Sequence, residues 1–418
     1  MRRLVGLIAG LALAAGSARA QQAPLYWWVQ AGAQGEWQLR SIWEPGATCP
    51  PSATVRADSS ADFPVLVCQQ TLGAQPVQLP RAARPLGAPA SVRRVVVIGD
   101  TGCRAQEQTC SEISSWPFAA VAGKAMSAGQ GLTVHVGDYI YREKCYTGIP
   151  GPCGDKWATW VADWFQPAGE LMTAAPWVFA RGNHEDCTRG GRGWFVFFDP
   201  RPYPANGCTP ATDPYAVQVP GAGTLLVMDT ACAPWYSTGC WSIDPPGSSG
   251  PVNDSTQAIP AFTAQFRQVA GMAGAGPAWL VTHVPTWARD FPGQADSVGA
   301  YILQAALRQA SPNAELPAAV GLSLTGHVHA WEALDFAAPR APVLVLGDGG
   351  TSESEGLPTE MVSPAGGVPV HGYWSSLAFG YTVLDADGAG GWRATLVPLA
   401  GTGAAVSCTL GSGAQLSC

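Results

Sequence analysis

Two short apolar runs, each ending at a Gly-Asp pair, constrain the fold more than any other feature of this 418-residue chain. Residues 95–98 are followed by the pair that contains Asp100, and residues 132–136 by the pair that contains Asp138. Short β-branched runs bounded by glycine are typical of strands buried on both faces of a sheet. Each strand then delivers an aspartate at its carboxyl end, the edge of an α/β sheet where ligand sites are usually built. One such aspartate is commonly a turn residue, but two after matched strands indicate a site.

Histidines follow three further apolar runs in the same way. They stand in Asn183-His184-Glu185, at His283, and in His327-Val328-His329. Four of the six histidines of the chain lie in these three places. Carboxylate and imidazole side chains are ligands of divalent and trivalent metals, so strand ends that collect them predict a metal site.

Together these blocks resemble the calcineurin-like metallophosphoesterase family, and most closely its purple acid phosphatase branch. The resemblance spans roughly residues 92–400, and all five blocks in order are far more specific than any one of them. The blocks are Asp100 in Gly-Asp-Thr-Gly, Asp138 and Tyr141 in Gly-Asp-x-x-Tyr, Asn183-His184-Glu185, His283, and His327-Val328-His329. The implied fold is α/β (α+β), a two-sheet β-sandwich flanked by helices.

The resemblance also implies two metal ions per chain and a ligand set for each. The first metal would be held by Asp100, Asp138, Tyr141 and His329. The second would be held by Asp138, Asn183, His283 and His327, so Asp138 would bridge the two. His184 is not a ligand in the family, and its implied place is near the leaving oxygen, as an acid or as a donor to phosphate. Glu185 and His135 are expected to support the ligands or the core.

One departure from the wider family bears on the identity of the first metal. Many relatives carry a histidine ligand two residues after the first aspartate, where this chain has Gly102. Tyr141, three residues after Asp138, stands where purple acid phosphatases place a tyrosinate. A hard phenolate favours Fe(III), so the resemblance implies iron at the first site and iron, zinc or manganese at the second.

The implied activity is hydrolysis of small phosphate esters by metal-activated water, with phosphomonoesters favoured. A phosphodiesterase or nucleotide hydrolase would use the same ligands, because the surrounding loops choose the substrate. A catalytically silent binding protein on the same fold is a third possibility, against which the intact ligand set argues. Arg189 and Arg192, on the glycine-rich loop after His184, are candidate substrate contacts, and a solvated loop is the equal alternative.

Residues 1–20 have the pattern of a cleavable secretory signal peptide, with Arg2 and Arg3, an apolar stretch, and a small-x-small end at residues 18–20. The apolar run is too short to span a bilayer comfortably, and no later stretch is long and apolar enough to do so. We therefore expect a periplasmic or secreted protein without membrane attachment after cleavage. Removal of three arginines would take the formal net charge from -7 to -10, which disfavours a nucleic-acid partner. The sequence does not indicate an oligomeric state.

The twelve cysteines all follow the signal segment, and an even count in an exported chain predicts disulfides. Spacing alone does not prove connectivity, but the safest pairing joins near neighbours. The couples are Cys49/Cys68, Cys103/Cys110, Cys145/Cys153, Cys187/Cys208, Cys232/Cys240 and Cys408/Cys418. No Cys-x-x-Cys pair is present, which disfavours a zinc finger.

Composition shifts divide the mature chain into three parts. Residues 21–90 read as a small N-terminal β module that ends in a proline-rich linker, residues 91–400 as the phosphoesterase domain, and residues 401–418 as a tail. The four tryptophans of the module could bind a ligand, but a core or interdomain role is more common. Within the main domain, Pro117 opens a predicted helix that runs to about residue 128.

Overall fold

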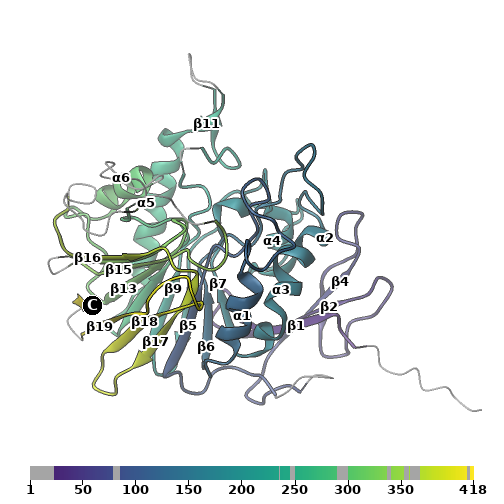
Figure 1. Ribbon diagram of the computed structural model, residues 1–418, viewed down its shortest axis with the longest axis horizontal. Helices are drawn as coiled ribbons and strands as arrows, with labels where there is room; N and C mark the ends of the chain where they lie inside the picture. The colour runs from purple at the N-terminus through teal and green to yellow at the C-terminus, as the bar shows by residue number, and fades with distance from the viewer. Residues whose placement is uncertain are drawn as a thin grey trace, which may run out of the picture.

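The computed structural model describes residues 23–78, 85–234, 236–244, 250–289, 300–336, 340–352, 357, 368–411 and 415–418. Two β-sheets pack face to face, and helices cover the outer face of each (Figure 1). This is the predicted two-sheet sandwich of the α/β (α+β) class. The predicted signal peptide lies outside the described residues.

The larger sheet has eleven strands, and its centre is parallel. Strands β5, β6 and β7 run parallel to one another, and β1 joins β7 in the same direction. In spatial order the strands are β20 (Leu416–Ser417), β19 (Val406–Leu410), β18 (Trp392–Pro398), β17 (Gly380–Ala386), β5 (Arg94–Ile98), β6 (Leu132–His135), β7 (Trp177–Phe179), β1 (Tyr26–Ala31), β2 (Trp37–Trp43), β4 (Leu66–Thr71) and β3 (Thr54–Ala57).

The smaller sheet has seven strands, of which β9, β12, β13 and β15 are parallel. Its order is β16 (Val370–Ser376), β14 (Trp331–Phe336), β15 (Val343–Leu346), β13 (Val320–Thr325), β12 (Ala278–Val281), β9 (Gly223–Val227) and β8 (Tyr215–Val219). Strand β15 is parallel to β13 on one side and antiparallel to β14 on the other. A separate two-stranded ribbon joins β10 (Ser242–Ile243) and β11 (Val252–Asn253).

Helices form the two outer layers (Figure 1). The larger sheet is covered by α1 (Phe118–Met126), α2 (Trp157–Trp160), the π-helical turn η1 (Val161–Phe165), α3 (Gln166–Ala168), the 3-10 turn η2 (Gly169–Thr173) and α4 (Gly191–Phe197). The smaller sheet is covered by α5 (Ser255–Met272) and α6 (Ala300–Ala310). The short turn η3 (Asn183–Glu185) follows β7. Helix α1 confirms the helix predicted after Pro117.

Strand β5 shows why a continuous apolar run is needed at the centre of such a fold. Val95 and Val97 point into the core between the two sheets, where they meet residues such as Leu225 of the smaller sheet. Val96 and Ile98 point the other way, into the layer under α1. Since side chains alternate along a strand, a strand covered on both faces must be apolar at every position.

The first four strands extend the larger sheet. Strand β1 pairs with β7, with Gln30 opposite Trp177, so residues 26–71 continue the sheet of the main domain. Buried Arg40 of β2 donates to the backbone carbonyls of Phe197 and Asp199, which ties the segment to the end of α4. The four tryptophans of these strands are buried, which agrees with a role in the core. The domain boundaries drawn from composition remain a prediction.

All six predicted disulfides are present, and no described cysteine is free. Five of them close loops of 7 to 21 residues, and the sixth joins Cys408 of β19 to Cys418 at the end of the chain. Among the helices described, none combines the length and the apolar character that a membrane crossing would require.

Candidate metal centre

The predicted ligand residues lie together where the carboxyl ends of both parallel strand sets meet. The loops after β5, β6 and β7 supply residues from the larger sheet, and those after β12 and β13 supply residues from the smaller one. Parallel strands deliver their carboxyl ends to one edge, which explains how residues spread over 230 positions converge. The side chains that meet there are Asp100, Asp138, Tyr141, Asn183, His283, His327 and His329.

One half of this centre is built around the hydroxyl of Tyr141. It lies 2.8 Å from Oδ2 of Asp138, 3.1 Å from Oδ1 of Asp100 and 2.8 Å from Nε2 of His329. Nδ1 of His329 donates to the carbonyl of Ser352 at 2.8 Å, so this nitrogen carries the proton. Nε2 therefore keeps its lone pair, which faces the other three groups. Four possible ligand atoms therefore point at one small volume.

The other half is built around the amide oxygen of Asn183. This oxygen lies 2.9 Å from Nε2 of His283 and 2.8 Å from Nδ1 of His327. His283 donates from Nδ1 to the carbonyl of Val136 at 2.8 Å, so its Nε2 faces inward. That same Nε2 is 3.2 Å from Oδ2 of Asp138. Asp138 thus belongs to both halves, since its carboxylate comes within 4.8 Å of the ligand atoms of each group.

Three site residues hold backbone conformations that L-amino acids rarely adopt. The φ angles are 52° at Asp100, 59° at Asp138 and 75° at His327. Only one other described residue that is not glycine has a positive φ, Ala314. Such conformations cost about 1–3 kcal/mol each and persist where the surrounding structure imposes them, typically at functional sites.

The electrostatics of the cluster match a site for cations. Asp100 and Asp138 are fully buried and close together, and burial raises the pKa of Asp100 to about 8, helped by the charge of Asp138. Burial alone would lower the pKa of His283, but the carboxylates of Asp138 and Asp100 outweigh it and raise that pKa to about 9. Two buried carboxylates that share a site are unfavourable without positive charge. The donor set of oxygens and imidazole nitrogens therefore fits metal ions.

The space beside Gly102 is occupied by Tyr141. A Cβ at position 102 would come within 2.8 Å of Cδ2 of Tyr141 and of the backbone of Ile140. A histidine ligand at position 102 and the observed Tyr141 ring are therefore mutually exclusive. The geometry gives a steric reason for the glycine and the tyrosine to occur together in this chain.

Glu185 and His135 support the ligand loops, as expected from the sequence. The Glu185 carboxylate accepts backbone N–H bonds from Asp138 at 3.1 Å and Tyr139 at 2.9 Å, so η3 is tied to the loop after β6. Buried His135 accepts from the backbone N–H of Gly137 at 3.1 Å, and its other nitrogen lies 3.1 Å from the hydroxyl of Thr101. Both residues hold the strained turns in place.

His184 lies at the opening of the site and has a partner that sequence reasoning missed. Its Nδ1 is 2.9 Å from Oε1 of Glu143, and its ring packs on the Tyr141 ring with the centroids 4.0 Å apart. Its backbone N–H donates to Oδ1 of Asp138 at 2.9 Å. Glu143 is buried, so it can hold the His184 ring in one orientation with Nε2 available. In the sequence, the only sign of this role is that Glu143 lies two residues after Tyr141. The residues around it have the composition of an ordinary charged loop.

The two candidate arginines lie in different places. Arg189 bonds to the carboxylate of Asp186 at 3.2 Å, and its charge interacts with Glu143 and Asp138 near the site. Arg192 instead pairs with Asp62 of the N-terminal strands at 2.8 Å and is half-exposed, an arrangement that does not favour a substrate contact. A third arginine was missed by sequence reasoning. The guanidinium of Arg104 lies 5.3 Å from the centre of the Tyr141 ring.

The far side of the site is bordered by Tyr236. Its hydroxyl is 3.4 Å from Nε2 of His327, and the side chain is exposed. Asp229, at the start of the same loop, pairs with buried Arg181 at 3.1 Å. That buried pair holds the loop in place.

Comparison with known proteins gives one family match and two structural likenesses. Residues 93–235 match the model of the calcineurin-like phosphoesterases. The fold is similar to that of a purple acid phosphatase from seeds of yellow lupin (Lupinus luteus), with a TM-score of 0.54 and 14% identity over 93% of this chain and 74% of that one. It is also similar to PhoD, with a TM-score of 0.53 and 14% identity over 96% of this chain and 92% of that one. At such identities the likeness concerns the fold. No curated protein sequence matches the chain.

Proposed function

We propose that this chain is a calcineurin-like phosphoesterase that hydrolyses small phosphomonoesters at a two-metal centre, a proposal that the family match of residues 93–235 supports. One observation carries the proposal. Asp138 stands between two groups of ligand atoms, each compact enough for a single ion. A shared carboxylate between two such groups is the arrangement that a dinuclear hydrolase needs.

The assignment of ligands follows the two halves of the centre. Asp100, Asp138, Tyr141 and His329 would hold the first ion, and Asp138, Asn183, His283 and His327 the second. When bound, two such ions supply the Lewis acidity that activates water and neutralises charge on a phosphoryl group. Tyr141 is the reason to assign Fe(III) to the first site, since a phenolate is a hard, anionic ligand. Iron, zinc or manganese would suit the second.

The protein groups around the opening handle the substrate. His184 presents Nε2 beside the centre, while Glu143 holds its Nδ1, so His184 can give a proton to the leaving oxygen. Arg189 and Arg104 would bring positive charge to an anionic substrate. We include export to the periplasm or medium in the proposal, because the N-terminal sequence has the signal-peptide pattern and the six disulfides suit an oxidising compartment.

Assays of the purified protein against two substrates, combined with metal analysis, test the proposal. An aryl phosphate should be hydrolysed faster than a bis-aryl phosphate, and the protein should contain about two metal ions per chain. A preference for the bis-aryl ester would replace the monoesterase assignment with a phosphodiesterase. Two bound metals without turnover of either ester would indicate a binding protein. A protein that neither binds metal nor turns over would contradict the site itself.

A further inference from the structure

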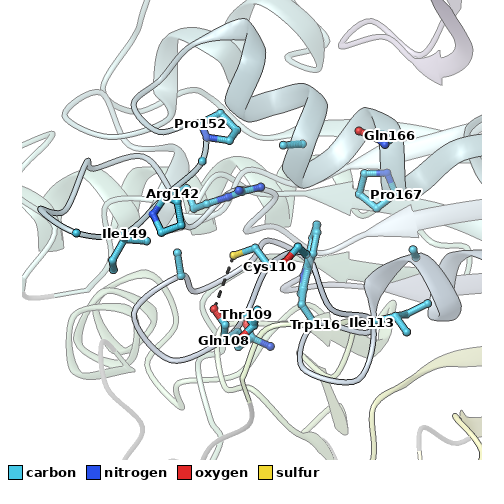
Figure 2. A pocket seen from close by; sticks show the side chains of 17 residues that line it. Gln108, Thr109, Cys110, Ile113, Trp116, Arg142, Ile149, Pro152, Gln166 and Pro167 are labelled. Atoms are coloured by element: carbon cyan, nitrogen blue, oxygen red, sulfur yellow. Dashed lines mark hydrogen bonds between the residues drawn. The ribbon is translucent and has the colours of Figure 1, made fainter.

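A pocket of about 910 Å³ is lined by residues next in sequence to the candidate metal centre (Figure 2). Tyr141 and Arg142 are consecutive, and Tyr141 faces the metal ligands while Arg142 lines the pocket. The other walls come from the loop after β5 and from η1 and α3. The disulfides Cys103–Cys110 and Cys145–Cys153 close the two loops that frame it. Stapled loops around an open pocket indicate a built feature.

The walls of the pocket are mainly apolar. Trp116, Ile149 and Pro167 are among the side chains that line it (Figure 2). Ile113 also faces it, and this isoleucine is 59% exposed, so a large apolar side chain stands in water at the mouth. Concave apolar walls with few polar groups are typical of sites for small organic molecules.

The polar group that points to a ligand is Arg142. Its side chain is 8% exposed, and both Nε and Nη2 donate to Oδ1 of Asp163, the first at 2.7 Å. Nη1 has no acceptor among the described residues, which include every residue of the pocket wall. Because Nη1 is not enclosed by protein atoms, a small molecule in the pocket can accept a hydrogen bond from it. Figure 2 shows the Arg142 side chain between Pro152 and Cys110, within the pocket.

We propose that this pocket binds a small apolar molecule that carries one anionic acceptor, such as a carboxylate or sulfonate, against Nη1 of Arg142. Asp163 already balances the charge of the arginine, and an acceptor on the ligand would add a charge-assisted hydrogen bond from Nη1. The apolar body of the ligand would pack on Trp116 and Ile149. The site is distinct from the metal centre and does not rest on the proposed function.

A pair of fluorescent probes tests the proposal on the full mature protein without added metal. 8-Anilinonaphthalene-1-sulfonate has an apolar body and one sulfonate, and N-phenyl-1-naphthylamine has the same ring system without the acceptor. We expect saturable one-to-one binding of the sulfonate, about tenfold tighter than that of the neutral analogue, because the charged hydrogen bond is available to only one of them.

Two variants locate the binding. Arg142→Lys keeps a cation for Asp163 but lacks the guanidinium fork, and it should remove the preference for the sulfonate, leaving the neutral probe unchanged. Ala162→Phe fills the pocket from η1 and should abolish binding of both probes. Ala264→Phe, on the exposed face of α5, is the matched control and should bind like wild type.

Three results would overturn the proposal. These are equal affinity of the wild type for the two probes, absence of saturable binding, and binding that Ala162→Phe leaves intact. Far-UV circular dichroism checks that each variant is folded. If Arg142→Lys does not fold, the probe preference of the wild type and the loss in Ala162→Phe still decide the question.

Discussion

The two halves of the metal centre differ in charge and in exposure. The half around Tyr141 has three oxygen ligands that can be anionic and one imidazole, and all four side chains are buried. The half around Asn183 has two imidazoles and a neutral amide, and shares only the carboxylate of Asp138. Its His327 is partly exposed and lies beside exposed Tyr236. Under the proposed function, the first set of donors would suit a trivalent ion and the second a divalent ion.

Under the proposed function, the same difference bears on where a substrate would enter. The buried half is closed by the rings of Tyr141 and His184, which are 4.0 Å apart, and by the Arg104 guanidinium. The partly exposed half faces the loop that carries Tyr236. A substrate that approaches from solvent would meet the second half first, with His184 and Arg189 at its border.

The largest effect is expected from Asp138→Asn, because this carboxylate is common to both halves. The amide has the same shape but no charge, so both ions should be lost and hydrolysis should fall to background, while circular dichroism stays that of the wild type. Metal content and turnover of an aryl phosphate are the measurements. Asp58→Asn, an exposed carboxylate far from the site, is the control. Near-normal activity with normal metal content would show that the halves do not share this ligand.

Tyr141→Phe should affect the first half alone. A phenolate on Fe(III) absorbs in the visible, so the oxidised, iron-loaded wild type should be purple or pink and the variant colourless. Iron should also bind more weakly, while some activity with manganese or zinc remains because the ligands of the second half are intact. Tyr146→Phe, at an exposed tyrosine, should keep the band. A colourless wild type would contradict the tyrosinate assignment and leave the rest of the site standing.

His327→Ala should produce the opposite pattern. Removing this imidazole weakens only the second half, so about one metal per chain should remain and the visible band should persist, while hydrolysis is lost. Metal analysis and the visible spectrum of the iron-loaded protein measure the two halves separately. His371→Ala, at an exposed histidine of β16, is the control. Loss of colour in His327→Ala would mean that the halves are not independent.

The smallest effect tests how tightly the first half is packed. Gly102→Ala places a methyl group 2.8 Å from the Tyr141 ring and the Ile140 backbone, which should cost about 1–3 kcal/mol of unfolding free energy. Gly123→Ala on α1 meets no atom within 4 Å and should be neutral or slightly stabilising. Urea unfolding of the two variants compares them. Equal stabilities would show that the space beside Gly102 is not filled by Tyr141.

The positions of the metal-ligand candidates were predictable because each follows a pattern that is local in the sequence. A strand that ends at Gly-Asp or Gly-His can be recognised within ten residues, and parallel strands bring their ends to one edge whatever their order. The six disulfides were predictable for a similar reason, since each joins near neighbours. Helix α1 was marked by its own proline.

Contacts between distant segments were not predictable in this way. Glu143 reaches His184 across 41 positions, and Arg192 reaches Asp62 across 130. The joining of β1 to β7 and the parallel pairing of β15 with β13 are also choices among strands with similar apolar patterns. Periodicity tells which face of a strand is buried but says nothing about which neighbour it pairs with.

The sequence alone therefore identified the candidate ligands, which are oxygen and imidazole groups at strand ends, with Tyr141 present where position 102 is a glycine. Only the tertiary structure decided how that chemistry is divided. The fold buries one half of the site and leaves the other partly exposed. It also places Glu143 beside His184 and Arg142 in the wall of a pocket. The physical reason is that ligand type belongs to single residues, whereas burial and partnership depend on segments that meet only after folding.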